Sequence, residues 1–454
     1  MSDAIAAQAD AWEVKPLADL AEKIQYGYTA KARSDSDGIR YLRITDIQDD
    51  QVDWGTVPSC DVGDAESEKY LLSVGDLVFA RTGATVGKSF LLRGSVPRAV
   101  FASYLIRVKL RNHVDPRYVA YFFQSPAYWN QIAESSAGIG QPNVNGTKLA
   151  QIRIPVAPPK QQQEIVAELE KQFSRLDEAV ANLQRVKANL KRYKASVLKD
   201  AIEGRLVPTE AELARREGRS FETGEQLLQW ILEKRRSQWN GKSKFKEPVA
   251  PDAVVLPALP AGWAWATYAQ VGEVTTGFTP PTGDVDNFGG NIPFFKPSDL
   301  DVGVNVTVAR EYLSEKGITK GRVLKADSVL VTCIGATIGK TGLAAVDCAT
   351  NQQINAVSPT DGGAVPLFIY HWTVSLTGQT QILDNSSATT LQILNKSKFE
   401  ALIVPLPPRS EQLRMVAEVD RRLSLVRGVE AEVNANLKRA QALRQSVLSK
   451  CFSG

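Results

Sequence analysis

The chain repeats itself once, at a spacing of about 250 residues. Ile154–Leu169 reads IPVAPPKQQQEIVAEL, and Val404–Val419 reads VPLPPRSEQLRMVAEV. A second pair of segments, LVFARTGATVGK at Leu77–Lys88 and VLVTCIGATIGK at Val329–Lys340, keeps nearly the same spacing. A repeat of this length indicates a duplicated domain with its connecting element rather than a short solenoid unit.

Composition sets wide limits on the class of protein. The 454 residues suffice for two to four domains. The 54 basic and 50 acidic residues give a net charge of +4, which permits nucleic-acid binding without arguing for it. The cysteines are scattered, as in a reduced, cytoplasmic protein; they are Cys60, Cys333, Cys348 and Cys451. Because the sequence has no apolar run of about 18 residues and no signal peptide, we expect a soluble cytoplasmic protein.

Each copy begins with short apolar runs separated by turn residues. Leu77–Ala80 and Ser328–Cys333 are typical of buried strands, and Tyr118–Phe123 and Leu367–Trp372 of helices between them. This pattern predicts an α+β class with two similar globular domains and two long helices. The expected boundaries are a first domain at 1–155, a first helix at 156–204, a connector at 205–262, a second domain at 263–405 and a second helix at 406–454.

The long helices carry apolar residues at heptad spacing. These residues are Leu169, Phe173, Leu176, Val180, Leu183 and Leu190 in the first copy, and Val419, Leu423, Val426, Val433 and Leu437 in the second. One helix cannot bury such a stripe alone, so we expect an antiparallel intramolecular coiled coil with pseudo-two-fold symmetry. About forty residues per helix would make a spacer of roughly 60 Å. The alternative is that each helix packs only on its own domain.

The connector contains two capping boxes that predict short helices. Thr209 with Glu212 opens one helix, and Thr223 with Gln226 opens the other. A basic tract follows at 234–246; it is either a solvated linker or a segment that reaches a nucleic acid.

Catalytic motifs are not evident in this sequence. The two histidines, His113 and His371, have no metal-binding spacing, so a histidine-based zinc site or a catalytic triad is not expected. The segment from Gly83 to Ser89 suggests a phosphate-binding loop, but only three residues separate Gly83 from Gly87, where a Walker A loop has four. A glycine-rich turn between strands is the simpler reading, and contact of its amides and its lysine with a DNA phosphate is the functional alternative.

The sequence segments that end the two domains resemble those of a known protein family. They are Ile154–Pro159 with Gln162, and Val404–Pro408 with Glu411 and Gln412. Together with the two Gly-Ala-Thr-x-Gly-Lys turns and the heptads that follow, they make the whole chain resemble the specificity subunit of Type I restriction–modification systems. The first copy departs from the second by carrying Gln161 where the second carries Glu411.

The resemblance implies that each domain reads one half of a bipartite, asymmetric DNA site. It further implies that the helices set the gap between the halves and bind two modification subunits. Those subunits would use S-adenosylmethionine to methylate adenine, and restriction subunits would use ATP and Mg²⁺ to translocate and cleave DNA. This chain would supply the DNA sequence specificity, and it would hold no cofactor and catalyse no reaction of its own.

The candidate DNA-binding side chains combine base-reading and phosphate-binding types. In the first domain they are Gln25, Tyr26, Tyr28, Arg33, Arg43, Arg81, Lys88, Gly138, Gln141 and Asn143. In the second they are Thr279, Lys296, Ser298, Lys340, Asn351, Gln352, Gln353, Thr389 and Thr390. The rival hypothesis is a non-catalytic scaffold with two docking domains held by a coiled coil, which does not account for divergence concentrated in the globular parts.

Overall fold

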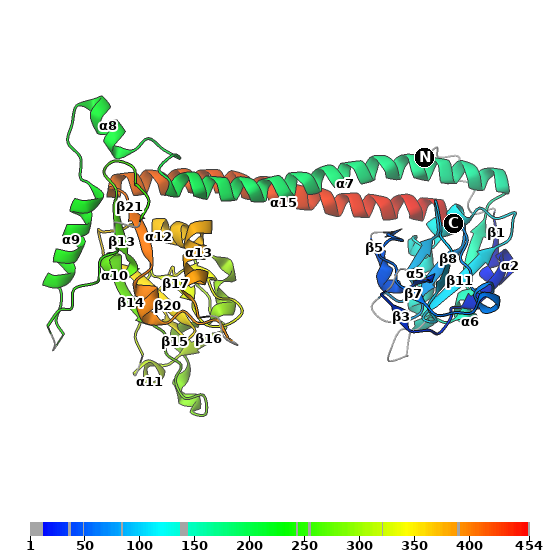
Figure 1. Cartoon of the computed structure of the whole chain (residues 1–454), viewed down its shortest axis with the longest axis horizontal. Helices are drawn as coiled ribbons and strands as arrows, with labels where there is room; N and C mark the ends of the chain where they lie inside the picture. Colours follow the sequence, from blue (N-terminus) through cyan, green and yellow to red (C-terminus); the bar gives the residue numbers. More distant parts are fainter. Residues whose placement is uncertain are drawn as a thin grey trace. The chain divides into compact units, whose positions relative to one another are not determined.

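The computed structural model describes residues 12–34, 38–48, 50–82, 85–136, 144–241, 244–252, 256–319, 321–387 and 391–452. The chain divides into two compact units, Met1–Arg185 with Val433–Gly454, and Val186–Glu432. Each unit contains one α+β domain and a part of each long helix (Figure 1). Among the described residues, no helix has the length and apolar character needed to span a membrane.

The domain of unit 1 is built on a four-stranded antiparallel sheet. Its strands are, in spatial order, β2 (Ala21–Tyr26), β11 (Leu105–Leu110), β8 (Leu77–Ala80) and β9 (Ser89–Leu91). A second sheet has the order β10 (Ala99–Phe101), β4 (Ile39–Leu42), β7 (Ser59–Cys60) and β3 (Ala32–Arg33). The remaining elements are β1 (Glu13–Pro16) paired with β12 (Arg153–Val156), β5 (Ile47–Gln48) with β6 (Gln51–Val52), and helices α2 (Leu17–Leu20), α3 (Asp64–Ser67), α4 (Pro116–Phe122), α5 (Pro126–Ser136) and α6 (Gly146–Ala150).

The domain of unit 2 has the same central architecture. Its antiparallel sheet has the order β14 (Gly272–Thr276), β20 (Ile354–Pro359), β17 (Val329–Thr332) and β18 (Thr341–Leu343). A second sheet has the order β16 (Glu311–Leu313), β15 (Phe288–Phe295) and β19 (Ala349–Thr350). The remaining elements are β13 (Ala264–Thr267) paired with β21 (Ile403–Leu406), and helices α10 (Tyr268–Val271), α11 (Glu315–Ile318), α12 (Pro366–Val374), α13 (Leu376–Asn385) and α14 (Lys396–Glu400).

Continuous apolar runs place the central strands in the core. Every residue of β8 and of β17 is buried, as expected for inner strands that are covered on both faces. The sequence-predicted strands and helices, including those at Tyr118–Phe123 and Leu367–Trp372, are confirmed to within a few residues.

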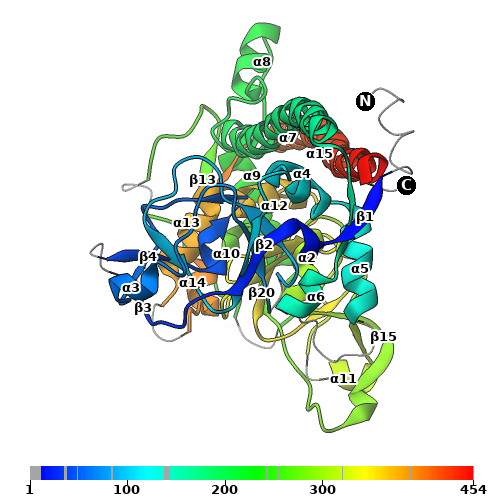
Figure 2. The ribbon, with the colours of Figure 1, turned by 90° about the vertical axis from the view of Figure 1, so that its right-hand side faces the viewer.

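The long helices α7 (Pro159–Ile202) and α15 (Arg409–Phe452) have 44 residues each. In unit 1 the start of α7 and the end of α15 pack together on α4, which lies directly beneath them in Figure 2. Phe173 of α7 contacts Tyr121 with ring centroids 5.6 Å apart, and Phe452 of α15 contacts Tyr118 at 5.2 Å. The end of one helix therefore completes the core beside the start of the other.

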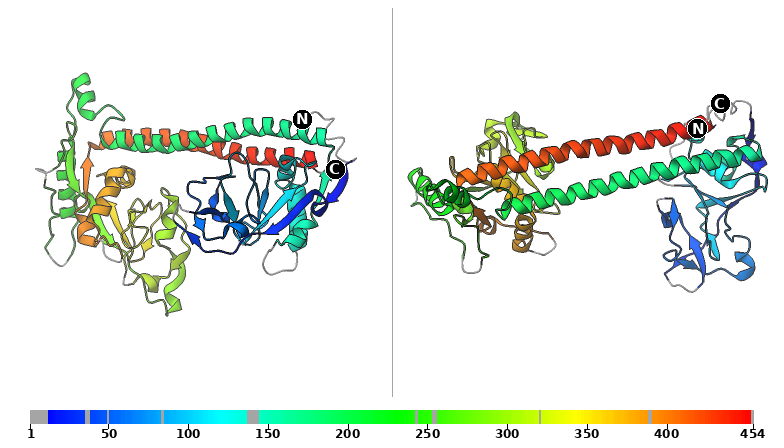
Figure 3. Two further views of the ribbon diagram at one scale, coloured as in Figure 1. Left: turned by 45° about the vertical axis from the view of Figure 1, so that its right-hand side comes forward. Right: turned by 90° about the horizontal axis from the view of Figure 1, so that it is seen from above.

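Unit 2 repeats this arrangement with the helices exchanged. Val197 and Ile202, near the end of α7, share one core with Met415 and Val419, near the start of α15. The ammonium of Lys194 binds the carboxylate of Glu430 at 2.6 Å. Within each unit the two helices lie side by side and run antiparallel (Figure 3), which confirms the predicted fold class.

Burial of the predicted seam varies along the helices. The fully buried members are Leu169, Phe173, Val419, Val426 and Val433, and the half-buried ones are Leu176, Val180, Leu183, Leu190, Leu423 and Leu437. Leu169, Phe173 and Val419 belong to the cores of the globular domains, whereas Val426 and Val433 are buried along the middle of α15.

A buried glutamine joins each domain to its long helix. The Gln162 carboxamide accepts a hydrogen bond from the Asp115 amide at 2.8 Å and donates to the Ala157 carbonyl at 2.7 Å. In unit 2, Gln412 accepts from the Val365 amide at 2.8 Å and donates to the Pro407 carbonyl at 2.8 Å. Both side chains are almost completely buried, so each glutamine holds the loop before α4 or α12 against the Pro-Pro turn.

The connector helices α8 (Glu210–Glu217) and α9 (Gly224–Ser237) begin at Thr209 and Thr223, and both predicted capping boxes are present. The basic tract is partly used inside unit 2. The guanidinium of Arg235 donates to the carbonyls of Ala269 and Gln270, and Lys234 donates to the Asp361 carbonyl at 2.7 Å.

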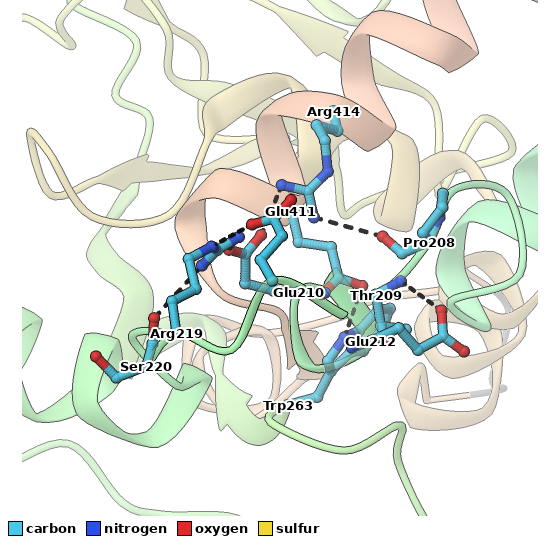
Figure 4. Close-up of polar contacts among 10 residues, drawn as sticks. Pro208, Thr209, Glu210, Glu212, Arg219, Ser220, Trp263, Glu411 and Arg414 are labelled. Carbon is cyan, nitrogen blue, oxygen red and sulfur yellow. Dashed lines mark hydrogen bonds and ion pairs between the residues drawn. The ribbon is translucent and has the colours of Figure 1, made fainter. Parts of the chain in front are cut away.

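A buried carboxylate fixes α8 to the start of α15 (Figure 4). Glu411 accepts hydrogen bonds from the Glu210 amide at 2.8 Å and from the Trp263 indole at 3.0 Å. Glu210 in turn binds Arg414 at 2.6 Å and Arg219 at 2.7 Å. Burial raises the pKa of Glu411, and its two donors oppose that rise.

The contacts of Glu411 give a reason why the second copy has a glutamate where the first has Gln161. Glu411 accepts its hydrogen bond from a backbone amide in the first turn of α8, where the helix dipole favours a negative charge. Unit 1 has the neutral Gln161 at the corresponding position.

We predict that Gln412→Ala destabilises unit 2 by about 2–4 kcal/mol, because it leaves the Val365 amide and the Pro407 carbonyl buried without partners. Hydrogen exchange of the Val365 amide and denaturant unfolding would measure the loss. The matched control is Gln229→Ala on the exposed face of α9, which should change stability by less than about 0.5 kcal/mol. Equal effects of the two substitutions would contradict the role of Gln412.

Candidate nucleic-acid interface

The described parts of the two Gly-Ala-Thr-x-Gly-Lys segments, Thr85–Lys88 and Gly335–Lys340, form tight turns between paired strands. The Gly87 amide donates to the Ala80 carbonyl at 2.9 Å, and the Gly339 amide donates to the Thr332 carbonyl at 2.9 Å. Gly87 and Gly339 have φ angles of +80° and +86°, a conformation that favours glycine. The predicted glycine-rich turn between strands is confirmed for the described residues, which exclude Gly83 and Ala84.

Each turn is held by a side chain from the second helix after it, α5 in unit 1 and α13 in unit 2. The Tyr128 hydroxyl donates to the Gly87 carbonyl at 2.6 Å, and the Gln379 amide donates to the Gly339 carbonyl at 2.9 Å. The lysines that end the turns differ in surroundings. Lys340 binds Asp301 at 2.6 Å, whereas Lys88 lines a cleft between the domain and the helices of unit 1.

Tyr26 and Arg81 form the best-defined part of the predicted interface in the first domain. The Arg81 guanidinium lies over the Tyr26 ring, 5.1 Å from its centroid. The Tyr26 hydroxyl accepts from the Gly146 amide at 2.7 Å, and the Arg81 carbonyl accepts from the Val144 amide at 3.2 Å. The predicted residues Gly138, Gln141 and Asn143 lie outside the described part of the chain, which resumes at Val144 beside Arg81.

Four other predicted residues of this domain make contacts within it. Gln25 accepts from Arg107 at 2.6 Å and donates to the Lys69 carbonyl at 3.1 Å, so its carboxamide supports the fold. The ring of Tyr28 packs on Tyr70, with centroids 5.4 Å apart. The last two are arginines in ion pairs, Arg33 with Asp61 and Arg43 with Asp46. The hydrogen bond with Asp46 raises the pKa of Arg43.

The second domain brings four predicted residues together. Asn351, Gln352 and Gln353 form the turn that enters β20, and Thr279 follows β14 beside it. The Thr279 hydroxyl bonds to the Gln352 carboxamide oxygen, and Asn351 donates to the Gln353 carboxamide oxygen at 2.9 Å.

The remaining predicted residues of this domain are dispersed. Lys296 binds Glu311 and lies 5.6 Å from the centroid of the Phe294 ring. Ser298 is exposed on the 3₁₀ turn Pro297–Val302. Thr389 and Thr390 lie outside the described residues.

Two exposed residues near the glycine turns, Tyr104 and Gln392, were missed by sequence reasoning. Tyr104 and Gln353 occupy equivalent positions, because their carbonyls accept from the Arg81 amide at 3.1 Å and the Cys333 amide at 2.7 Å, respectively. Gln392 is exposed, and its carbonyl accepts from the Gly335 amide at 3.0 Å. Aligning the two copies around the glycine turns would have pointed to Tyr104, the counterpart of Gln353.

Acidic, histidine and cysteine side chains form no candidate metal site in the described ranges. Groups of three or more histidine, cysteine, aspartate or glutamate side chains able to hold a metal are absent there. His113 is exposed and His371 is buried. All four cysteines are buried thiols, and burial raises the pKa of Cys333 to about 12, which opposes thiolate formation.

We predict that Gly339→Ala destabilises unit 2 by about 2 kcal/mol, since φ is positive there and a Cβ would meet the Gln379 side chain. The control is Gly428→Ala, within the regular helix α15, where no atom lies within 4 Å of the added carbon. That substitution should stabilise the protein by up to about 1 kcal/mol. Thermal unfolding of both variants tests the pair, and a neutral Gly339→Ala would contradict the strained turn.

Comparison with known proteins agrees with the geometry. Residues 9–191 and 260–435 match the family model described as Type I restriction modification DNA specificity domain. The chain is 33% identical over 137 residues to the Type I restriction enzyme EcoBI specificity subunit of Escherichia coli, an alignment that covers 30% of this chain and 28% of that protein. It is 23% identical to the HindI specificity subunit of Haemophilus influenzae over 75% of this chain and 78% of that protein.

The fold also matches a solved structure. A chain from a type I R-M system aligns with a TM-score of 0.66 and 19% identity, covering 98% of each chain. The family model covers both copies of the repeat, including the two glycine turns and the start of each long helix. This chain therefore belongs to the family of Type I restriction–modification DNA specificity domains.

Proposed function

We propose that this chain is the DNA-recognition subunit of a Type I restriction–modification complex. The domains at 1–155 and 263–405 each read one half of a bipartite, asymmetric DNA sequence. The chain itself is not an enzyme; the chemistry belongs to its partners. The observation that carries this proposal is a duplicated scaffold that presents different side chains at equivalent positions.

The equivalence rests on backbone hydrogen bonds. The Gly27 amide donates to the Leu105 carbonyl at 3.2 Å, and the Gly277 amide donates to the Ile354 carbonyl at 2.9 Å. These bonds align Ala102-Ser103-Tyr104 with Asn351-Gln352-Gln353, and the amide–carbonyl bonds of Arg81 and Cys333 keep the same register. One backbone thus presents different hydrogen-bonding groups, as required of two modules that read different bases.

The long helices suit the role of spacer. Each has 44 residues, or roughly 66 Å at 1.5 Å per residue. Two half-sites on one face of B-DNA lie about 34 Å apart, or a multiple of that distance. We propose that the paired helices at 156–204 and 406–454 set the unread gap between the half-sites.

The helices also offer a surface for the modification subunits. In unit 2 the exposed large apolar side chains on the described parts of α7 and α15 are Val186, Tyr193, Leu413, Leu425 and Val429. Lys191 and Arg192 are exposed near Tyr193. Apolar residues exposed on paired helices favour a protein partner over solvent. We propose that two modification subunits, which carry S-adenosylmethionine, dock there, and that restriction subunits with ATP and Mg²⁺ join the complex in the cytoplasm.

A scaffold without DNA recognition is the rival function. It accounts for the duplication and for the helix pair. It gives no reason for the amide-rich turn Asn351–Gln353 to stand where the first domain has Ala102, Ser103 and Tyr104. We therefore favour recognition of DNA.

We predict that the purified chain with S-adenosylmethionine and DNA transfers no methyl group. Adding the modification subunit should produce adenine methylation confined to one bipartite sequence, and the modification subunit alone should not. Methyl transfer to plasmid DNA, followed by sequencing of the modified sites, measures both. Transfer by the isolated chain would contradict the non-catalytic role.

A second prediction tests the docking surface. The double substitution Leu425→Lys and Val429→Lys should lower co-purification of the modification subunit by at least about tenfold, because charges replace an apolar contact. Val308→Lys is the control, since Val308 is 72% exposed and belongs to the second globular domain rather than to a long helix. Unchanged thermal unfolding would show that the helices still pair, and unchanged co-purification would contradict docking at this face.

A further inference from the structure

We infer that Gln352 and Gln353 read adenine bases in the half-site of the second domain, and that Asn351 and Thr279 are positioning residues for them. This inference rests on the proposed function and deepens it, because it names the base type and the side chains that recognise it.

The backbone of the turn is fixed on three sides. The Asn351 amide donates to the Phe295 carbonyl at 3.2 Å, and the Ile354 amide donates to the Asn351 carbonyl at 3.1 Å. The Gln353 carbonyl accepts from the Cys333 amide of the glycine turn at 2.7 Å. The two glutamines are therefore presented from a rigid support that joins β15, β17 and β20.

Neighbouring side chains hold both carboxamides in one orientation. Asn351 is 7% exposed, and its side-chain nitrogen donates to the side-chain oxygen of Gln353 at 2.9 Å. Its side-chain oxygen accepts from the backbone amide of Gln353 at 3.2 Å. The Thr279 hydroxyl bonds to the Gln352 oxygen. Among the described residues, no acceptor contacts the side-chain nitrogen of Gln352 or Gln353, so both donors remain available.

Adenine matches this arrangement of groups. A carboxamide can donate to adenine N7 and accept from the adenine N6 amino group in the major groove. Each held oxygen keeps a second lone pair for that purpose. The charges of the nearby lysines are balanced, because Lys296 binds Glu311 and Lys340 binds Asp301. The side chains of the turn are themselves neutral, which suits them to base edges rather than to phosphates.

The first domain cannot make the same contacts. Its equivalent residues, Ala102, Ser103 and Tyr104, contain no carboxamide. The two half-sites are therefore expected to differ, and adenine recognition by this turn is expected in one of them only.

The test uses the full chain assembled with its modification subunit and duplexes that carry the mapped site. Replacing each adenine of one half-site in turn by 7-deazaadenine removes N7 and leaves base pairing intact. At one or two positions the wild-type complex should lose about tenfold or more in affinity. In the Gln352→Ala or Gln353→Ala complex, 7-deazaadenine at that position should cause no further loss.

Matched variants separate the outcomes. Thr279→Val should weaken binding at the position that Gln352 reads, and Thr279→Ser should restore it. Tyr104→Ala should affect only the other half-site. If Gln352→Ala and Gln353→Ala keep the full 7-deazaadenine effect, or leave affinity for natural DNA unchanged, the inference is overturned. A wild-type complex that methylates no bipartite site would instead overturn the proposed function.

Discussion

Each long helix carries an apolar stripe that it cannot bury alone, and the rest of the structure follows from how that stripe is covered. The start of one helix and the end of the other meet on a globular domain, so both helices contribute to both cores. Phe452 completes the core of unit 1, and Ile202 is its counterpart in unit 2. A domain in this chain therefore includes residues from distant parts of the sequence.

The contacts that join each domain to its long helix are the same in the two copies of the repeat, whereas the side chains at the candidate DNA interface differ. Gln162 and Gln412 make the same pair of buried hydrogen bonds, and Pro158 and Pro408, which lie four residues before them, are also identical. A buried carboxamide satisfies one amide and one carbonyl at once, and few other side chains can do this. At the opposite extreme, Tyr104 and Gln353 share a backbone position and have different chemistry. Because the contacts between domain and helix are kept while the candidate interface varies, DNA specificity can change without loss of the fold.

Much of the fold could be predicted from sequence because it depends on periodic burial. The heptads, the strand at Leu77–Ala80 and the capping boxes at Thr209 and Thr223 are local patterns with local causes. The candidate interface was harder to predict, because the use of a polar side chain depends on neighbours distant in sequence. Gln25 had the right chemistry, yet Arg107 and the Lys69 carbonyl occupy its carboxamide. Similarly, Asp301 engages Lys340.

We predict that sequence information for DNA modification resides in this chain, and genome-wide mapping of N6-methyladenine tests that claim most directly. A host that expresses the chain with its modification partner should show one split, asymmetric motif that disappears when the chain is removed. The same methylated sites in both hosts, with an active modification subunit, would contradict the account and favour a scaffold.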